Sequence, residues 1–176
     1  KAFITHTYGR STGVAYALFP YDFTFTSFAS STNHKPIVFI AKEVDAKETV
    51  KTKNSYKHPG ISHQSTTTLK DSGKVITKLH TFSAKAVHDP MTAMLEIRKQ
   101  ALENGDVVKI CAHPFASPYQ LTITVLSREK HLSYDCIKLD VKIRKIDKKT
   151  GNLRAYKKLK KATLWITDDS QRVPVE

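Results

Sequence analysis

The sequence lacks several features that would assign a function class directly. It has no run of about 18 apolar residues, which argues against a membrane-spanning helix. Only two of its 176 residues are cysteines, too few for a scaffold built on disulfides. It has no glycine-rich phosphate loop and no Gly-x-Ser-x-Gly, and its eight histidines show no metal-ligand spacing. We therefore expect no cofactor and no metal.

Acidic residues are also scarce. Asp and Glu number 16 against 29 Lys and Arg, which gives a formal net charge of +13. Residues 128–161 hold 13 of these cations and four acids, so most of the excess lies in this segment. A strong positive charge favours an anionic partner such as nucleic acid, an anionic lipid surface or an acidic polysaccharide.

Apolar and polar residues alternate with period two along most of the chain, which is typical of half-buried strands. We expect a mainly β, single domain over residues 1–176, monomeric, with about 11 short strands. They would form an antiparallel curved sheet, or an open barrel or half-barrel, packed on one helix. Residues 43–62 resemble a weak strand plus a loop. Predicted strands cover 14–19, 36–42, 62–69, 74–82, 107–112, 119–127, 134–146, 153–158, 161–167 and 171–175.

One helix is predicted over about residues 90–104. Asp89 is the expected N-cap, and Pro90 stands at the first helical position, where proline is well tolerated. Met91, Met94 and Leu95 recur at helical spacing, and Asn104-Gly105 provides a stop signal. An apolar face of this kind indicates a core helix.

The basic segment predicts a hairpin with an anion-binding face. In the strand 134–146, Ile137, Leu139, Val141 and Ile143 should point inward, which leaves the intervening cations outside. A bulge at Arg144-Lys145 would account for a slip in this pattern, and Lys149 to Asn152 should form the turn. The predicted contacts to a polyanion are Lys138, Lys142, Arg144, Arg154, Tyr156, Lys158 and Lys160.

The tripeptide Asp71-Ser72-Gly73 has two interpretations. Asp-Ser-Gly carries the catalytic carboxylate of aspartic proteases, which need a second carboxylate to share a proton. That partner would come from a homodimer or from Asp168 or Asp169. The flanking Lys70 and Lys74 instead indicate an exposed turn, with Gly73 in the left-handed conformation.

The C-terminal half resembles a known family. "YQLTITVLSRE" (119–129), "YDCIKLDVK" (134–142) and "ATLWITDDSQRVPVE" (162–176) are similar to the bacterial domain-of-unknown-function family 3108, over about residues 88–176. Trp165, Thr167, Asp168, Asp169, Arg172, Pro174 and Val175 carry the resemblance. The resemblance implies an exported protein of a Gram-negative bacterium, in the periplasm, envelope or medium, and establishes no activity. Asp168 and Asp169 should lie in a turn, with Arg172 placed to pair with one of them.

Cys111 and Cys136 both fall in the strand phase opposite the main apolar set, so they could meet. One disulfide and two free thiols remain alternatives.

We expect a non-enzymatic binding protein whose partner is DNA backbone or an acidic glycan, such as a mucin chain. One alternative is a hydrolase of the aspartic-protease type that uses Asp71. A second alternative is a structural or lipid-handling envelope protein with an apolar cavity.

Overall fold

The computed structural model describes residues 1–57, 60–83, 87–155 and 162–175. The chain divides into two compact units. Unit 1 comprises residues 1–92 and 114–116, and unit 2 comprises residues 93–113 and 117–176. Strands dominate the described residues of both units, which confirms the expected mainly β class. The expectation of a single domain stays a prediction.

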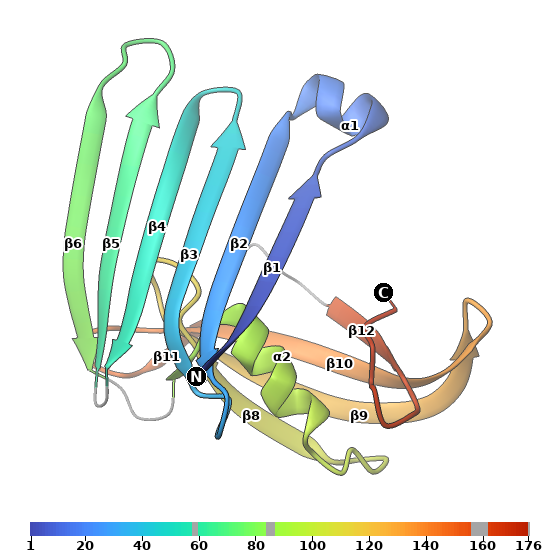
Figure 1. The fold of residues 1–176 in the computed structure, drawn as a ribbon. Helices are drawn as coiled ribbons and strands as arrows, with labels where there is room; N and C mark the ends of the chain where they lie inside the picture. The colour runs from blue at the N-terminus through green and yellow to red at the C-terminus, as the bar shows by residue number, and fades with distance from the viewer. Residues whose placement is uncertain (58–59, 84–86, 156–161, 176) are drawn as a thin grey trace. The chain divides into compact units, whose positions relative to one another are not determined.

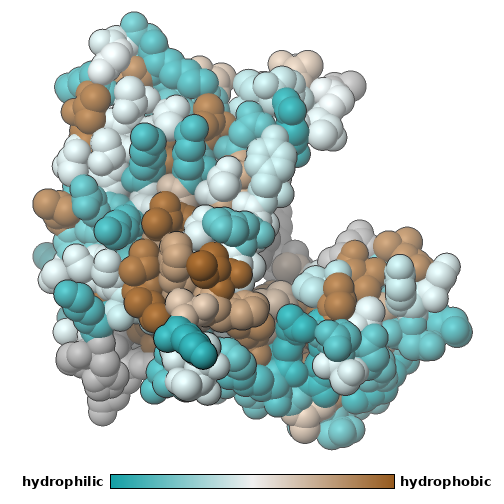
Figure 2. Space-filling view, viewed as in Figure 1, coloured by the Kyte–Doolittle hydropathy of each residue, from teal (hydrophilic) through white to brown (hydrophobic). Residues whose placement is uncertain are grey.

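Six strands of unit 1 form one antiparallel sheet in which each strand pairs with the next along the chain (Figure 1). Figure 2 shows polar and apolar side chains mixed over these strands on the face in view. The strands are β1 (Ala2–Arg10), β2 (Tyr21–Ser30), β3 (Pro36–Asp45), β4 (Glu48–Lys57), β5 (Gly60–Leu69) and β6 (Val75–Ser83). A short strand, β7 (Val87–His88), follows them.

The buried face of this sheet combines aromatic rings with polar groups. Phe25 packs against Phe39 and Phe115, with ring centroids 5.6 and 5.8 Å away. The neighbouring buried positions are polar: Ser27, Thr52, Asn54, His63 and Asp89 are each at most 4% exposed. A buried polar group is costly unless it is hydrogen-bonded. These groups meet that requirement in part through one another, since His63 Nδ1 lies 2.7 Å from Asn54 Oδ1.

A short helix, α1 (Gly13–Leu18), occupies most of the segment predicted as a strand over 14–19. Ala15 and Ala17 favour a helix, and alanine is the strongest helix former. The N–H of Phe19 closes the last turn by donating to the Ala15 carbonyl (2.8 Å). Pro20 then disfavours helical backbone at the preceding residue, so the helix ends there.

The main strands of unit 2 form an antiparallel sheet in the order β8–β9–β10, extended by β11 and β12, which both pair with β10. The inward side chains of β10 are Ile137, Leu139 and Val141, as predicted, and the first two are fully buried. These elements are β8 (Val107–Ala112), β9 (Tyr119–His131), β10 (Tyr134–Ile146), β11 (Leu153–Ala155) and β12 (Ala162–Thr167). The predicted strand over 171–175 is wrong: in this segment Pro174 forms an isolated bridge with Ile166 of β12, and no strand forms.

Helix α2 (Pro90–Arg98) begins where predicted and ends six residues early. Asp89 Oδ1 accepts hydrogen bonds from the N–H groups of Met91 (2.8 Å) and Thr92 (3.0 Å), which confirms the N-cap. Beyond Arg98 the chain leaves the helix and places Leu102, with φ of 58°, fully buried in the core. Ala93 and Ile97 of the helix complete that core on the inward face of the unit 2 sheet.

Candidate anion-binding surfaces

The face of the unit 2 sheet opposite its core carries exposed cations. Lys142 and Arg144 of β10 lie on this face, because they alternate with the inward residues. Lys109 of β8 joins them: it pairs with Thr122 of β9, and Thr122 pairs with Lys142. Two strand spacings separate the backbones at Lys109 and Lys142, about 10 Å. We call Lys109, Lys142 and Arg144 the basic outer face.

Lys109 was missed in the sequence because its strand, "VVKICA", is mainly apolar. Its position in the strand was the available signal, since Val108 and Ile110 on either side point inward. Lys109 lies outside residues 128–161, the segment in which the sequence concentrates its cations, so the predicted basic surface did not include it. Only the register between β8 and β9 brings Lys109 next to Lys142.

Two of the outer-face cations have partners within the protein, and all three are exposed. Lys142 Nζ lies 3.5 Å from Asp140 Oδ2, and the lysine side chain is 71% exposed. Arg144 Nη2 donates to the carbonyl of Leu153 (3.3 Å). The Asp140 side chain is only 12% exposed, so the pair faces solvent on the lysine side alone, and there an external anion can approach the Lys142 ammonium.

Lys138 has a different environment. Its Nζ lies 3.1 Å from Glu129 Oε1 and 5.3 Å from the ring centroid of Trp165. Trp165 Nε1 donates to the same Glu129 oxygen (3.3 Å), and its ring stacks on His131. These contacts indicate that Lys138 packs within a side-chain cluster, and we leave it out of the basic outer face.

The structure corrects the predicted hairpin face. Arg144 pairs with Ala155 and Lys145 pairs with Arg154, so Arg144 and Arg154 lie on opposite faces of the ribbon. Arg154 forms an ion pair with Asp147 (2.7 Å). The pairing of Arg144 and Lys145 with β9 is regular, so the predicted bulge is wrong there, and the register shifts at Lys138/Leu139 instead. Three predicted contacts, Tyr156, Lys158 and Lys160, lie outside the described residues.

Positive charge also gathers at the β10–β11 turn. Burial, together with repulsion from Lys145, lowers the pKa of Lys148. The turn itself is as predicted: Gly151 has φ of 72°, and its N–H donates to the Asp147 carbonyl (2.8 Å). The N–H groups of Thr150 and Lys149 hold the pKa of Asp147 below its ordinary value.

Asp71-Ser72-Gly73 is the tip of the β5–β6 hairpin. Gly73 has φ of 65°, and its N–H donates to the Leu69 carbonyl (3.0 Å). Asp71 is exposed, and its Oδ1 accepts a hydrogen bond from the N–H of Ser72 (2.6 Å). The tripeptide therefore forms the turn that its charged neighbours predicted.

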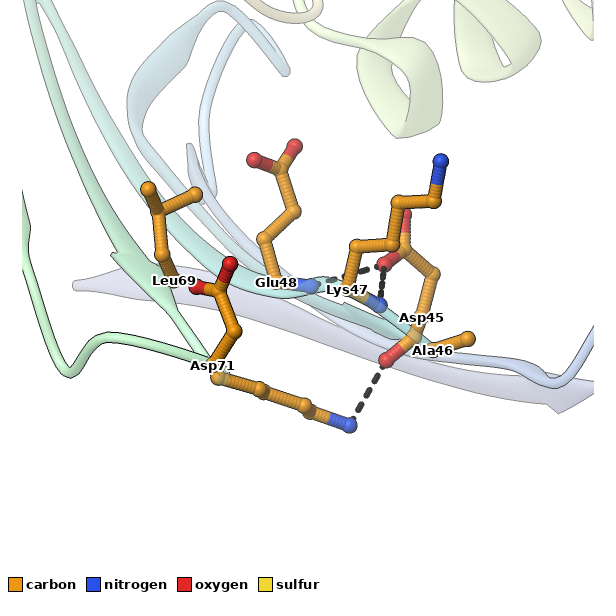
Figure 3. Close-up of a pocket in the computed structure, with 7 residues that line it drawn as sticks. Asp45, Ala46, Lys47, Glu48, Leu69 and Asp71 are labelled. Atoms are coloured by element: carbon orange, nitrogen blue, oxygen red, sulfur yellow. Dashed lines mark hydrogen bonds between the residues drawn. The ribbon is translucent and has the colours of Figure 1, made fainter.

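Asp71 also lines a hollow of about 620 Å³ at this end of the unit 1 sheet (Figure 3). Asp45 and Glu48 line it too, and Lys70 Nζ donates to the Asp45 carbonyl (2.6 Å). The N–H groups of Glu48 and Lys47 bond to the Asp45 carboxylate and lower its pKa. A shared-proton dyad needs one carboxyl with a raised pKa. The shift at Asp45 is in the opposite direction, and protease activity at Asp71 stays an unsupported prediction.

The Asp168-Asp169 turn is observed, although with different partners from those expected. Asp169 Oδ1 accepts from the N–H groups of Arg172 (2.9 Å) and Gln171 (2.8 Å) and from the Thr167 hydroxyl, which lowers its pKa. Asp168 pairs with Arg128 at 2.9 Å. Both carboxylates thus have partners of their own within the fold, and neither is paired with the other.

Arg172 pairs with Asp169 through its backbone N–H, whereas its side chain has other partners. The Arg172 guanidinium donates to the carbonyl of Arg98 (3.2 Å), at the end of α2, and to those of Gln100 and Ala101 (3.0 Å) just beyond it. The last carbonyls of a helix lack partners within the helix. A planar guanidinium with several donors can satisfy the Arg98 carbonyl together with two carbonyls beyond the helix.

Both cysteines are free thiols, and a disulfide between them is wrong for this fold. Cys111 is level with Gln120, and Gln120 with Arg144, which stands eight residues along β10 from Cys136. At about 3.4 Å per residue this separation far exceeds the 7 Å limit between bridged Cα atoms. Burial raises the pKa of both thiols.

The described residues include no group of three or more His, Cys, Asp or Glu side chains placed to hold a metal ion. Among the same residues, no helix is long and apolar enough to cross a membrane.

The architecture defines a β-rich protein of two antiparallel sheets with an exposed cationic face on unit 2. Comparison with known families gives a match to DUF3108, a family of proteins of unknown function, over residues 1–176. The chain belongs to this family. The match extends over the whole chain, beyond the C-terminal half in which the resemblance was noted. No curated protein and no solved structure gives a significant match.

Proposed function

We propose that the protein is an exported, non-enzymatic binding protein for polyanions, either DNA backbone or acidic glycans. The observation that carries this proposal is the basic outer face of Lys109, Lys142 and Arg144, in a chain with a formal net charge of +13. The location in the periplasm, envelope or medium rests on the resemblance noted in the sequence.

The side chains of this face suit anionic groups better than bases. Thr122 lies between Lys109 and Lys142, and Gln120 lies beside Arg144. Threonine and glutamine are among the side chains that contact phosphate in nucleic-acid complexes, as are lysine and arginine. We therefore expect binding with little sequence preference and a strong dependence on salt.

The test compares two double variants of equal charge. K109Q/K142Q removes two outer-face cations, whereas K99Q/K130Q removes two exposed lysines elsewhere in unit 2, and each lowers the formal net charge from +13 to +11. Binding to labelled duplex DNA and to heparin is measured by fluorescence anisotropy between about 50 and 200 mM salt. We expect K109Q/K142Q to lose about tenfold more affinity than the control at about 50 mM salt and to show a smaller salt slope.

Wild-type protein that binds neither probe at the lowest salt would overturn the proposal. Equal losses in the two double variants would show that the basic outer face is not the contact surface.

A further inference from the structure

We infer that unit 1 carries a second anion-binding surface, built on Lys42, Lys51 and Lys53, and that its ligand is an acidic polysaccharide. The ligand class deepens the proposed function and rests on it, whereas the site is separate from the basic outer face. We call these three residues the lysine face.

The register places the three lysines together on the face of the sheet opposite the buried aromatic rings. Lys51 and Lys53 alternate along β4 with Thr52 and Asn54, which are buried. Lys42 of β3 pairs directly with Lys51. Cβ atoms of directly opposed residues lie about 4.5–5.5 Å apart, so two ammonium groups share one small area of the sheet.

This arrangement is electrostatically unfavourable in the free protein. Like charges directly opposite each other destabilise a sheet. All three side chains are exposed, and none forms an ion pair with a carboxylate of the described residues. Asp22 lies on the same face of the described strands, and it already pairs with Arg10 (3.5 Å) and accepts a hydrogen bond from Tyr8. An anion bound between the lysines would offset this repulsion. The charge of the face is therefore complementary to that of an anionic ligand.

The neighbouring side chains suit an acidic polysaccharide. Lys42 lies beside Thr24, Lys51 beside Thr66, and Lys53 beside Gln64. These side chains offer hydroxyl and amide groups to a chain of sugar hydroxyls, sulfates and carboxylates. Tyr8, which pairs with Thr24 on the same face, bonds to Asp22 through its hydroxyl, whereas single-stranded bases stack on successive aromatic side chains.

The experiment uses three triple variants of the full chain. K42Q/K51Q/K53Q removes the lysine face. K35Q/K47Q/K74Q removes three exposed lysines from loops of the same unit, so both have a formal net charge of +10. K109Q/K142Q/R144Q removes the basic outer face. The probes are a fluorescent heparin fragment and a labelled 20-base-pair DNA duplex, each titrated at about 50 mM salt.

We expect K42Q/K51Q/K53Q to bind heparin at least tenfold more weakly than the loop-lysine control and to lose less affinity for the duplex. We also expect a melting temperature at or above that of the wild type, since repulsion between lysines is removed; this shows that lost binding does not reflect unfolding.

If K42Q/K51Q/K53Q bound heparin as well as the loop-lysine control does, the proposal that the lysine face binds an anion would be overturned. A loss of heparin binding confined to K109Q/K142Q/R144Q would do the same but would leave the proposed function standing. A larger loss for the duplex than for heparin would overturn the glycan assignment. If the wild type bound neither probe, both proposals would fail.

Discussion

The two sheets have interiors of different chemistry. Unit 2 encloses an apolar cluster in which Ile123, Ile137, Leu139 and Ile166 are fully buried. Unit 1 instead buries Asn54, His63 and Asp89 beside its phenylalanine rings. An apolar core is stabilised by the removal of surface from water, whereas a polar interior depends on each hydrogen bond being made. The difference teaches that two antiparallel sheets of similar architecture can be stabilised differently, one mainly by burial of apolar surface and the other by buried hydrogen bonds.

The largest expected effect tests the apolar core of unit 2. Leu139→Ala should lower the free energy of unfolding by about 2–5 kcal/mol, because it removes buried methyl groups and leaves a cavity. Trp165, the single tryptophan, lies in unit 2 and pairs with Lys138 next to the substitution, so its fluorescence reports the transition during urea unfolding. A decrease in the free energy of unfolding of less than about 1 kcal/mol would contradict the view that this apolar core stabilises unit 2.

The polar interior of unit 1 should respond to pH at Asp89. Burial raises the pKa of this carboxyl in the folded protein, although the N–H of Thr92 and the Ser27 hydroxyl oppose the shift. The stability gained from the neutral carboxyl is therefore complete below the unfolded pKa of about 4 and is lost as pH rises through the folded pKa. Asp89→Asn keeps an N-capping oxygen and cannot ionise.

We expect the stability of Asp89→Asn relative to the wild type to rise with pH above about pH 4, by about 1.4 kcal/mol for each unit by which the pKa is raised. Urea unfolding measured at intervals from acid to neutral pH gives this difference directly. A stability difference between variant and wild type that does not change with pH would contradict a raised pKa of the buried Asp89 carboxyl.

The smallest expected effect is at the hairpin tip. Asp71→Asn should change the free energy of unfolding by less than about 0.5 kcal/mol, because the side chain is exposed and its bond within the described residues is to the adjacent N–H of Ser72. The amide oxygen can accept the same bond. Any acid-pH proteolytic activity should also be unchanged. Activity that disappears in this variant would restore the protease interpretation.

The same contrast explains where sequence-based prediction succeeded. Strands β8 and β10 were predicted with their observed ends, because their inward residues are apolar and their outward residues are polar. Strand β4 was predicted only as a weak strand and a loop, since its inward residues include Thr52 and Asn54. A hydrophobic pattern cannot reveal a strand whose buried face is polar. Helix α1 was missed because a short run of alanine and bulky residues fits both the helical and the strand pattern.

The candidate surfaces were predicted in part. Lys142 and Arg144 follow from alternation along one strand, so the sequence was sufficient for them. Lys109 and the opposition of Lys42 and Lys51 required the pairing between strands. Residues on different strands meet according to the register, and a shift of one residue would turn every side chain to the other face.

Local chemistry alone determined the β-rich class, the start of α2 at Asp89-Pro90, and the Asp71-Ser72-Gly73 turn. These features depend on residues near one another in the chain, through alternation, capping and glycine backbone freedom. The tertiary structure decided that Arg172 binds carbonyls more than seventy residues earlier, and that Arg144 and Arg154 lie on opposite faces. Those contacts join distant segments, and no local preference specifies which segments will pack together.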